Sequence, residues 1–206
     1  MKTFQVKHVI KWMEETNKKI VQNKEYLTSL DQAIGDGDHG INMARGFQEV
    51  VNKITSQDYA TTADALKNVA MTLISKVGGA SGPLYGTAFL KFSMAAKDQD
   101  VTYDIFVKGV EDACNGIKQR GKADVGEKTM LDVWCPVADQ LKKENQFNAD
   151  VISRTAKQAM ANTKDMMATK GRASYMKERS IGHLDPGAVS SFYLFEALAE
   201  VIYEGA

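Results

Sequence analysis

The apolar residues of this 206-residue chain recur at the spacing of an α-helix along most of its length. The first stripe contains Phe4, Val6, Val9, Ile10 and Met13, which fall on one face of a helix. Strict alternation of apolar and polar residues, the pattern of a half-buried strand, hardly occurs. We therefore expect an all-α protein with about eight helices. After the first helix, the expected helices lie at roughly residues 41–54, 62–77, 83–97, 102–119, 129–144, 149–169 and 186–204.

The segments between these helices are short and rich in glycine or aspartate, and no Pro/Ser-rich linker divides the chain. At 44% apolar residues, a chain of this length buries roughly 70% of its unfolded surface, which is enough for a real core. We expect residues 1–206 to form one domain, a bundle of antiparallel up-and-down helices. Alternate connections of such a bundle lie at the same end. One rim should therefore carry residues 34–42, 78–86, 121–129 and 171–187.

The 26 basic and 26 acidic side chains cancel, so the formal net charge is zero. A chain without excess positive charge is not drawn to nucleic acid or to an anionic bilayer, and we expect neither as a partner. The most apolar stretch, Phe192 to Tyr203, contains Glu196 and Glu200, and no leader-like apolar segment opens the chain. These features are typical of a cytoplasmic protein.

The two cysteines, Cys114 and Cys135, form neither a C-x-x-C pair nor a Cys/His cluster at zinc spacing. A structural zinc and a dithiol redox centre are therefore not indicated. We expect two buried free thiols in a reducing compartment.

Three carboxylates stand close together in the first of the proposed rim loops, whose sequence is DQAIGDGDHGIN. Asp31, Asp36 and Asp38 are separated by glycines, which let the backbone bend and bring the side chains together. Such oxygen-rich clusters suit Mg²⁺, which binds a few carboxylates while phosphates and waters complete its octahedron. The alternative interpretation is an ordinary Gly-Asp turn in which Asp38 caps the next helix.

Two regular motifs that this segment matches on paper are excluded. The run from Gly35 to Gly40 satisfies G-x-G-x-x-G, but a dinucleotide site needs a preceding strand and a βαβ unit. An EF-hand fails as well, because Ala33 and Gly35 would stand at ligand positions and Asn42 would replace the bidentate Glu. What remains is glycine-rich backbone at a helix N-terminus, where free N–H groups can bind phosphate.

A second glycine loop, Gly78 to Pro83, precedes another expected helix. Its small residues let a phosphate approach the backbone, and Pro83 suits the first turn of a helix. The loop is not a Walker A motif, since no G-K-[ST] follows, and Pro83 excludes the G-x-S-x-G nucleophile elbow. Taken alone, Gly-Gly after a helix is often only a stop signal.

The last rim loop ends in Asp185-Pro186-Gly187, a strong start for the final helix with Asp185 as its N-cap. Capping alone would explain Asp185. Arg172 lies in the same loop, and a guanidinium can pair bidentately with phosphate, although most arginines are solvated surface charges. The loop GKADVGEKT at residues 121–129 is also basic and contains glycine. It is expected to cover an adenine if it closes the same rim.

Four runs of sequence resemble, in order, motifs of the nucleotide-binding L subunits (DhaL) of bacterial dihydroxyacetone kinases. They are IGDGDHGINMARGF, GGASGPLYGTAF, GKADVGEKTM and the stretch from GRASY to DPGA. The similarity covers nearly the whole chain. It implies a closed barrel of about eight antiparallel helices that binds an adenine nucleotide, ADP or ATP, and two Mg²⁺ ions at one end.

By position, the resemblance assigns the metal ligands to Asp31, Asp36 and Asp38. It assigns the nucleotide contacts to His39, Gly40, Ile41, Asn42, Ala80, Ser81, Gly121, Met130, Arg172, Asp185, Pro186 and Gly187. Arg172 and His39 are expected to hold the phosphates during transfer, in which positioning and electrostatics dominate. No covalent nucleophile is expected on this chain.

The resemblance further implies a relay between subunits. A K subunit would bind dihydroxyacetone, and an M subunit of the phosphotransferase system, fed by phosphoenolpyruvate, would rephosphorylate the bound ADP. One helical domain fills the chain and leaves no segment for a sugar-binding domain, so we expect that it does not complete the reaction alone.

Three other functions are compatible with parts of this pattern. The same motifs would serve an ATP-dependent kinase component, including fatty-acid-kinase-like relatives, in which the nucleotide exchanges after each turnover. A regulatory subunit that senses nucleotide and contacts a transcription regulator would need a partner surface but no phosphate turnover. A hydrolase built on Ser81, a histidine and an aspartate is disfavoured by the missing nucleophile elbow.

Overall fold

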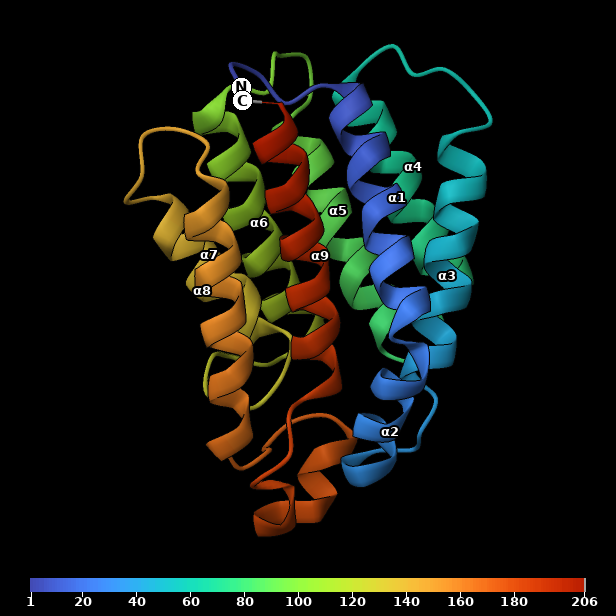
Figure 1. The fold of residues 1–206 in the computed structure, drawn as a ribbon, viewed down its shortest axis with the longest axis vertical. Helices are drawn as coiled ribbons and strands as arrows, with labels where there is room; N and C mark the ends of the chain where they lie inside the picture. The colour runs from blue at the N-terminus through green and yellow to red at the C-terminus, as the bar shows by residue number, and fades with distance from the viewer. Residues whose placement is uncertain (206) are drawn as a thin grey trace.

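Eight long helices run up and down around a common axis in residues 1–205, the part of the chain that the computed structural model describes (Figure 1). No strand occurs in these residues, and Phe4 and Val101 form a single β-bridge. The all-α prediction is confirmed. The α-helices are α1 (Val6–Gln22), α2 (Lys24–Ile34), α3 (His39–Ile54), α4 (Thr62–Lys76), α5 (Ser81–Ala95), α6 (Tyr103–Gly121), α7 (Leu131–Leu141), α8 (Ala149–Asn162) and α9 (Pro186–Glu204). Two 3-10 helices, η1 (Thr163–Asp165) and η2 (Arg172–Ser180), lie between α8 and α9.

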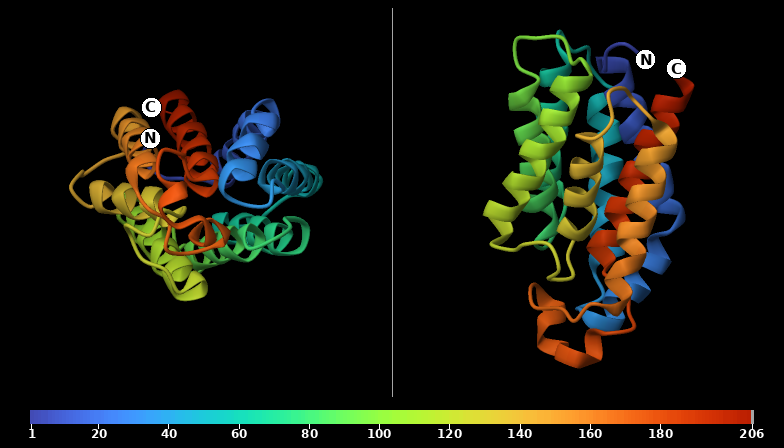
Figure 2. Two further views of the ribbon diagram at one scale, coloured as in Figure 1. Left: turned by 90° about the horizontal axis from the view of Figure 1, so that it is seen from below. Right: turned by 90° about the vertical axis from the view of Figure 1, so that its left-hand side faces the viewer.

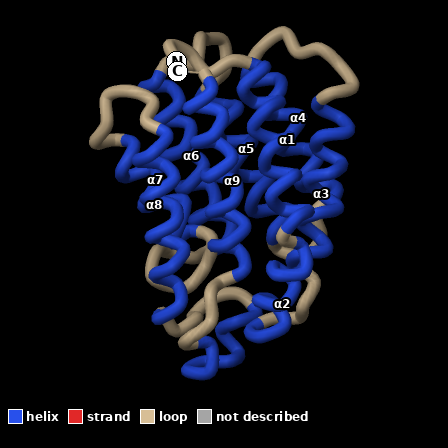
Figure 3. Tube along the Cα trace, in the orientation of Figure 1, coloured by secondary structure: helices blue, strands red, loops and turns tan. Residues whose placement is uncertain are grey.

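The long helices form a closed ring, which Figure 2 shows from below. Helix α1 packs against α3, each later helix packs against the next one, and α9 returns to α1. The order around the ring is therefore the order along the chain, as expected for an up-and-down barrel. Connections at one end join α3 to α4, α5 to α6 and α7 to α8, and the remaining connections lie at the other end (Figure 3).

The interior of the ring is filled by large side chains, so the barrel is a packed core. Trp12 and Phe89 approach with ring centroids 5.3 Å apart, and Trp134 and Phe195 with centroids 4.9 Å apart. All four are buried, and the Trp12 indole N–H donates to the Leu194 carbonyl oxygen at 2.8 Å, as a buried indole requires. Within residues 1–205, no helix combines the length and the apolar character that crossing a bilayer requires.

Helix α2 leaves the barrel, because the first predicted helix is interrupted at Asn23. The Asn23 side-chain nitrogen donates to the Lys19 carbonyl oxygen at 2.8 Å, in addition to the backbone N–H of Asn23 at 3.1 Å. Beyond this point α2 packs against α3, α9 and η2, below the ring in Figure 1. Its last turn carries Asp31 to the same end of the barrel as the glycine loops. The sequence analysis placed the first connection at residues 34–42 and did not predict this break.

The connection between α8 and α9 is longer and more structured than the sequence predicted. The helix expected at residues 149–169 ends at Asn162, and residues 163–185, which we call the strap, continue below the barrel. The strap contains both 3-10 helices, and Lys177 interrupts the second with a φ of 49°. It thereby crosses the open end of the ring before α9 begins.

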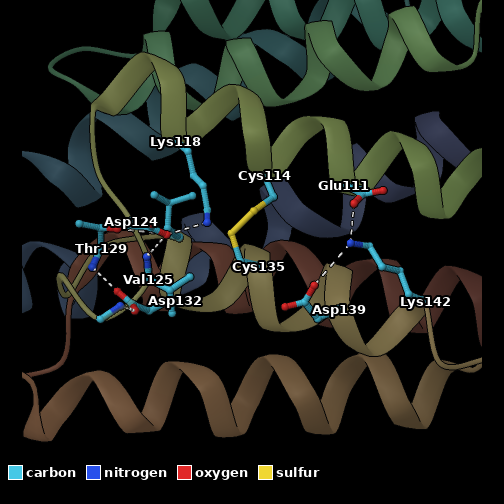
Figure 4. Close-up of a disulfide and its surroundings, with 12 residues drawn as sticks. Glu111, Cys114, Lys118, Asp124, Val125, Thr129, Asp132, Cys135, Asp139 and Lys142 are labelled. Carbon is cyan, nitrogen blue, oxygen red and sulfur yellow. Dashed lines mark hydrogen bonds and ion pairs between the residues drawn. A yellow bond between two sulfur atoms is a disulfide. The ribbon is translucent and has the colours of Figure 1, made fainter.

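The expectation of two free thiols is wrong, because Cys114 of α6 and Cys135 of α7 form a disulfide (Figure 4). The two helices are antiparallel neighbours, and the Cα atoms of the pair lie 5.6 Å apart. Both residues are buried, as predicted. The sequence argument considered short Cys spacings and zinc patterns, whereas the helical hairpin brings together cysteines that are distant along the chain.

Candidate functional site

Four connections meet at the end of the barrel opposite the chain termini and enclose a cleft of about 310 Å³. They join α2 to α3, α4 to α5, α6 to α7 and α8 to α9, which are the alternate connections predicted to share one rim. The predicted site residues that line the cleft are Asp31, Asp36, Asp38, His39, Asn42, Ala80, Ser81, Met130, Arg172, Asp185, Pro186 and Gly187.

Three predicted nucleotide contacts, Gly40, Ile41 and Gly121, lie beside the cleft and do not line it. Gly40 is buried where α3 meets α2, and a Cβ atom there would collide with the Lys24 carbonyl oxygen. Ile41 is 53% exposed on the first turn of α3. Gly121 ends α6, with its Cβ position 3.3 Å from Leu84, which does line the cleft. Their contact with a nucleotide stays a prediction.

The three aspartates of the first loop converge. Oxygen atoms of Asp31, Asp36 and Asp38 all lie within 4.8 Å of one another. Asp31 is buried, and its Oδ2 accepts hydrogen bonds from the backbone N–H groups of Asp38 at 2.9 Å and His39 at 3.0 Å. Asp31 therefore caps α3. Asp38 occupies the N-cap position, but its side chain makes no capping bond, so the alternative interpretation of Asp38 as a helix cap is wrong.

The glycines of this loop are required for its geometry. A Cβ atom at Gly35 would collide with Asp31 Oδ1, and Gly37 has a φ of 76°, in the left-handed region. Asp31 Oδ1, unlike Oδ2, makes no hydrogen bond within residues 1–205. The loop thus holds three carboxylates together against their repulsion, with oxygens left for a ligand. This donor set fits a hard divalent cation such as Mg²⁺.

Arg172 of the strap is directed at this acidic cluster. Its Nε lies 2.9 Å from Asp36 Oδ2, with side-chain exposures of 70% and 36%. An ion pair this exposed contributes little to folding stability. Its significance is the position of the guanidinium, beside the carboxylates and at the cleft, where it can bind an anion held by a cation at the aspartates.

His39 is buried between two serines at the floor of the cleft. Its Nδ1 lies 3.2 Å from Ser81 Oγ, and its Nε2 lies 2.9 Å from Ser190 Oγ. Burial lowers the pKa of His39, although the charges of Asp31 and Asp38 act in the opposite direction. The side chain is therefore a neutral imidazole at neutral pH, able to donate one hydrogen bond and accept another.

The surroundings of His39 exclude the hydrolase alternative. A catalytic triad needs a carboxylate hydrogen-bonded to the imidazole nitrogen opposite the serine. In residues 1–205 that nitrogen meets Ser190 Oγ, which in turn lies 2.8 Å from the Tyr85 hydroxyl. The ring is held by hydroxyl groups that fix its orientation and supply no charge.

The glycine loop before α5 presents backbone to the cleft. Helix α5 begins at Ser81, two residues before Pro83, and Ala80 at the N-cap position has no side-chain cap. The N–H groups of the first turn consequently have no intrahelical partner, and the helix dipole favours negative charge there. Gly79 has a φ of 65°, which a side chain would disfavour. This arrangement suits a phosphate.

Asp185 both caps a helix and lines the cleft. Its Oδ2 accepts from the Ala188 N–H at 2.7 Å, which confirms the predicted cap of α9. Burial raises the pKa of Asp185 to about 7, and the negative charges of Asp132 and Asp31 add to this shift. The Ala188 hydrogen bond and the Lys128 charge oppose it. The electrostatic cost of this buried carboxylate falls when a cation binds nearby.

The sequence analysis missed Lys128, which is 1% exposed and lines the cleft. Its ammonium is surrounded by backbone carbonyl oxygens of the strap. In the sequence, Lys128 stands in a charged, glycine-containing loop, where a lysine is normally solvated. No local signal distinguishes it from Lys122 of the same loop, because its burial depends on where the strap folds.

A DAK2 domain is recognised over residues 33–200. The chain is 48% identical to the "PEP-dependent dihydroxyacetone kinase 1, ADP-binding subunit DhaL" of Listeria innocua, over 96% of this chain and 98% of that protein. It is 48% identical to the "PTS-dependent dihydroxyacetone kinase, ADP-binding subunit DhaL" of Lactococcus lactis, over 94% and 96%. Its identity to the corresponding PEP-dependent subunit of Escherichia coli is 43%, over 93% and 94%.

Solved structures share the fold. The dihydroxyacetone kinase of C. freundii in its native form superposes with a TM-score of 0.76 at 23% sequence identity, over 93% of this chain. The same kinase in complex with AMP-PNP and Mg²⁺ gives a TM-score of 0.74. The chain spans about a third of that larger kinase, at 34% and 33% of its length. At this level of identity the likeness shows a common helical barrel.

Proposed function

The chain belongs to the DAK2 domain family, and on that premise we propose that it is the ADP-binding subunit of a phosphoenolpyruvate-dependent dihydroxyacetone kinase. One observation carries the proposal. The acidic cluster, the glycine loop, Arg172 and the Asp185 helix start come from three separate connections and line one cleft. Relatives that match nearly their whole length are named as ADP-binding subunits. A single domain spanning residues 1–206 is part of this proposal.

We assign the phosphates of the nucleotide to the centre of the cleft. There the N–H groups of Ser81, Gly82 and Gly187 offer donors, and Arg172 offers charge. His39, held by Ser190 at Nε2, would donate from Nδ1 to a phosphate oxygen in place of its contact with Ser81. Arg172 and His39 are the proposed catalytic residues. The base would lie against Met130, beside Gly121, where the wall is apolar.

The carboxylates of Asp31, Asp36 and Asp38 would hold Mg²⁺, two ions in the complete site. Bound Mg²⁺ supplies charge neutralisation for the transferred phosphoryl group. The chain's own contribution is to keep a carboxylate oxygen of each aspartate within 4.8 Å of the other two. Gly35, Gly37 and the backbone hydrogen bonds to Asp31 maintain this arrangement. The cation would also relieve the repulsion within the cluster.

The partners that this role requires are a K subunit that binds dihydroxyacetone and an M subunit that returns phosphate to bound ADP. The relatives are named as PEP-dependent or PTS-dependent kinase subunits, which supports the presence of partner subunits. A cytoplasmic setting is part of the same proposal. Contact with a transcription regulator would be an addition to this role, since it needs a surface and no turnover.

Native mass spectrometry of the purified protein tests the proposal. We expect a mass increment of one ADP and two Mg²⁺ per chain that survives dilution and disappears after dialysis against EDTA. Retention of ADP without added nucleotide supports the phosphoenolpyruvate-linked form, whereas rapid exchange with labelled ATP supports an ATP-dependent kinase. Absence of ADP binding in the presence of excess Mg²⁺ would overturn both.

A further inference from the structure

Lys128 links the α6–α7 loop to the strap, and both segments line the cleft. The residue lies in the loop between α6 and α7, directly before Thr129 and Met130, which line the cleft. Its side chain runs in the opposite direction, into the strap. Its φ of 60° is in the left-handed region, which a lysine adopts at an energetic cost, so the fold imposes this conformation.

The Lys128 ammonium is coordinated by the backbone of both ends of the strap. From the first end, the carbonyl oxygens of Thr163 and Met166 lie 2.8 Å and 3.0 Å from Nζ. From the second end, those of Ser180 and His183 lie 2.8 Å and 2.6 Å away. The Lys164 carbonyl oxygen is at 3.5 Å. The geometry resembles the shell of carbonyl oxygens around a monovalent cation.

A buried set of carbonyl oxygens that converge on one point needs positive charge at that point. Each oxygen carries partial negative charge, and an ammonium offers three N–H donors. Without it, the oxygens would repel one another, and those of Met166 and His183 would lose their hydrogen-bond donor inside the protein. The carboxylates of Asp185 and Asp165 act on Lys128 from outside this shell.

The two ends of the strap are also joined to each other, by the hydrogen bonds that Gly182 N–H donates to the Lys164 carbonyl oxygen at 2.7 Å, Ala168 N–H to Ser180 Oγ at 2.9 Å and Asp185 N–H to Thr163 Oγ1 at 3.2 Å. These bonds hold the ends together, whereas the contacts that fix the strap to the rest of the protein are few. Its apolar contact with α2 is small, with Ile34, Ala168 and Ala173 as its buried members. A further tie to the α6–α7 loop is a pair of 3.3 Å hydrogen bonds that Thr169 donates to Glu127. A segment with so little apolar burial opens locally at low cost, so the polar clamp decides where it lies.

We propose that Lys128 is a positioning residue for the nucleotide: by clamping both ends of the strap, it places Arg172 and Asp185 at the cleft. Arg172 sits between the two clamped ends, and Asp185 follows His183 by two residues. Lys128 itself would act through the strap and touch no reacting atom. This inference rests on the proposed function, because it concerns the same cleft.

The test is a double-mutant cycle in which calorimetry measures the affinity for ADP in the presence of Mg²⁺. Lys128→Met keeps the length of the side chain and removes its charge and donors. We expect the affinity to fall by about tenfold or more, and Arg172→Ala to cost much less in the Lys128→Met background than in the wild type. Lys122→Met is the matched control, because Lys122 is an exposed lysine of the same loop, also with positive φ.

The outcomes separate this inference from the proposed function. If the wild type does not bind ADP, the proposed function fails. If the wild type binds ADP, and Lys128→Met lowers the melting temperature but leaves affinity and the effect of Arg172→Ala unchanged, Lys128 is merely structural and the inference is overturned. Equal losses in Lys122→Met and Lys128→Met would overturn it as well.

A second measurement covers the case in which Lys128→Met does not fold. In the wild-type protein with nitrogen-labelled lysine, NMR should detect one ammonium group that exchanges slowly with water, as expected for a buried, hydrogen-bonded Lys128. Its resonance should shift when ADP and Mg²⁺ bind, because the strap is coupled to the cleft. A resonance that stays unchanged at saturating ADP, or no protected ammonium at all, would overturn the proposal.

Chemical rescue adds a measurement that distinguishes the return of the missing amine from a general increase in stability. In Lys128→Ala, propylammonium should restore affinity for ADP, because it returns the missing amine to the carbonyl shell. Propanol, which is similar in size and uncharged, should not. Equal rescue by both compounds would show that the side chain only fills space.

Discussion

The carboxylates of Asp31 and Asp38 have different structural tasks, although they belong to one cluster. Asp31 accepts two backbone hydrogen bonds at the start of α3, while the Asp38 side chain makes no capping bond. We predict that Asp38→Asn weakens ADP binding with Mg²⁺ roughly 10- to 100-fold, the effect of losing one charge-assisted interaction. Isothermal titration calorimetry measures it.

The same substitution should not harm the unliganded fold. Removing one of three adjacent negative charges relieves repulsion, so the melting temperature without ligand is expected to stay constant or rise. Asp58→Asn, in the exposed connection between α3 and α4, is the control. Equal ADP affinity in Asp38→Asn and the control would contradict the metal site, and a large drop in the unliganded melting temperature would make Asp38 structural.

Arg172 is expected to matter for turnover far more than for stability. Its ion pair with Asp36 is exposed and contributes at most about 1 kcal/mol to folding. Arg172→Ala should therefore melt like the wild type but lower the rate of phosphoryl transfer by a factor on the order of 100 or more. The measurement is turnover in a system reconstituted with the partner subunits. Arg179→Ala, an exposed arginine of the same 3-10 helix, should retain wild-type turnover.

The hairpin formed by α6 and α7 is held together by a disulfide between the helices and by polar contacts within its loop. The Cys114–Cys135 disulfide joins the helices, and the Lys118–Asp124 ion pair and the Asp132 carboxylate hold the loop beside it (Figure 4). Asp132 accepts hydrogen bonds from the Gly126 and Thr129 N–H groups. The α6–α7 loop is therefore held by a covalent bond and by polar contacts, and the strap beside it is bonded to this loop through Lys128 and Thr169.

We predict that reduction of the disulfide destabilises the protein without unfolding it at room temperature. A cross-link closing a loop with a sequence separation of 21 contributes about 3 kcal/mol in the chain-entropy treatment. For a domain of this size that corresponds to a fall in melting temperature of very roughly 6–12 °C. Thermal unfolding with and without reductant measures it, and Cys135→Ala should show no response to reductant. An identical response of both proteins would assign the effect to something other than this bond.

A comparison of the expected helix bounds with the observed ones shows what the apolar pattern can predict. Most helices lie close to their predicted ranges, because their apolar stripes repeat with the period of the helix. The break at Asn23 and the early end at Asn162 were not predicted, since the sequence analysis placed the first connection at residues 34–42 and expected a helix over residues 149–169. These ends are set by side-chain hydrogen bonds and by packing of the following segment, which are tertiary effects.

For the whole molecule, topology predicted which connections meet at the cleft better than any single motif did. Alternation of an up-and-down bundle put four connections at one end, and the cleft lies there. The partners of Asp31 and the burial of Lys128 could not be predicted. Both depend on the path of the backbone in loops where glycines allow many conformations.

Because the cleft joins α2, α3, α5, α7, the strap and α9, its ligands should stabilise the whole fold. Ligands that bind only the folded state at about a thousand times their dissociation constant contribute roughly 4 kcal/mol. Stripping ADP and Mg²⁺ with EDTA and dialysis should then lower the melting temperature by very roughly 8–16 °C. Hydrogen exchange should rise first at residues 34–42 and 171–187, which have few buried apolar anchors. A melting temperature indifferent to EDTA, or exchange that rises uniformly along the helices, would place the ligands elsewhere.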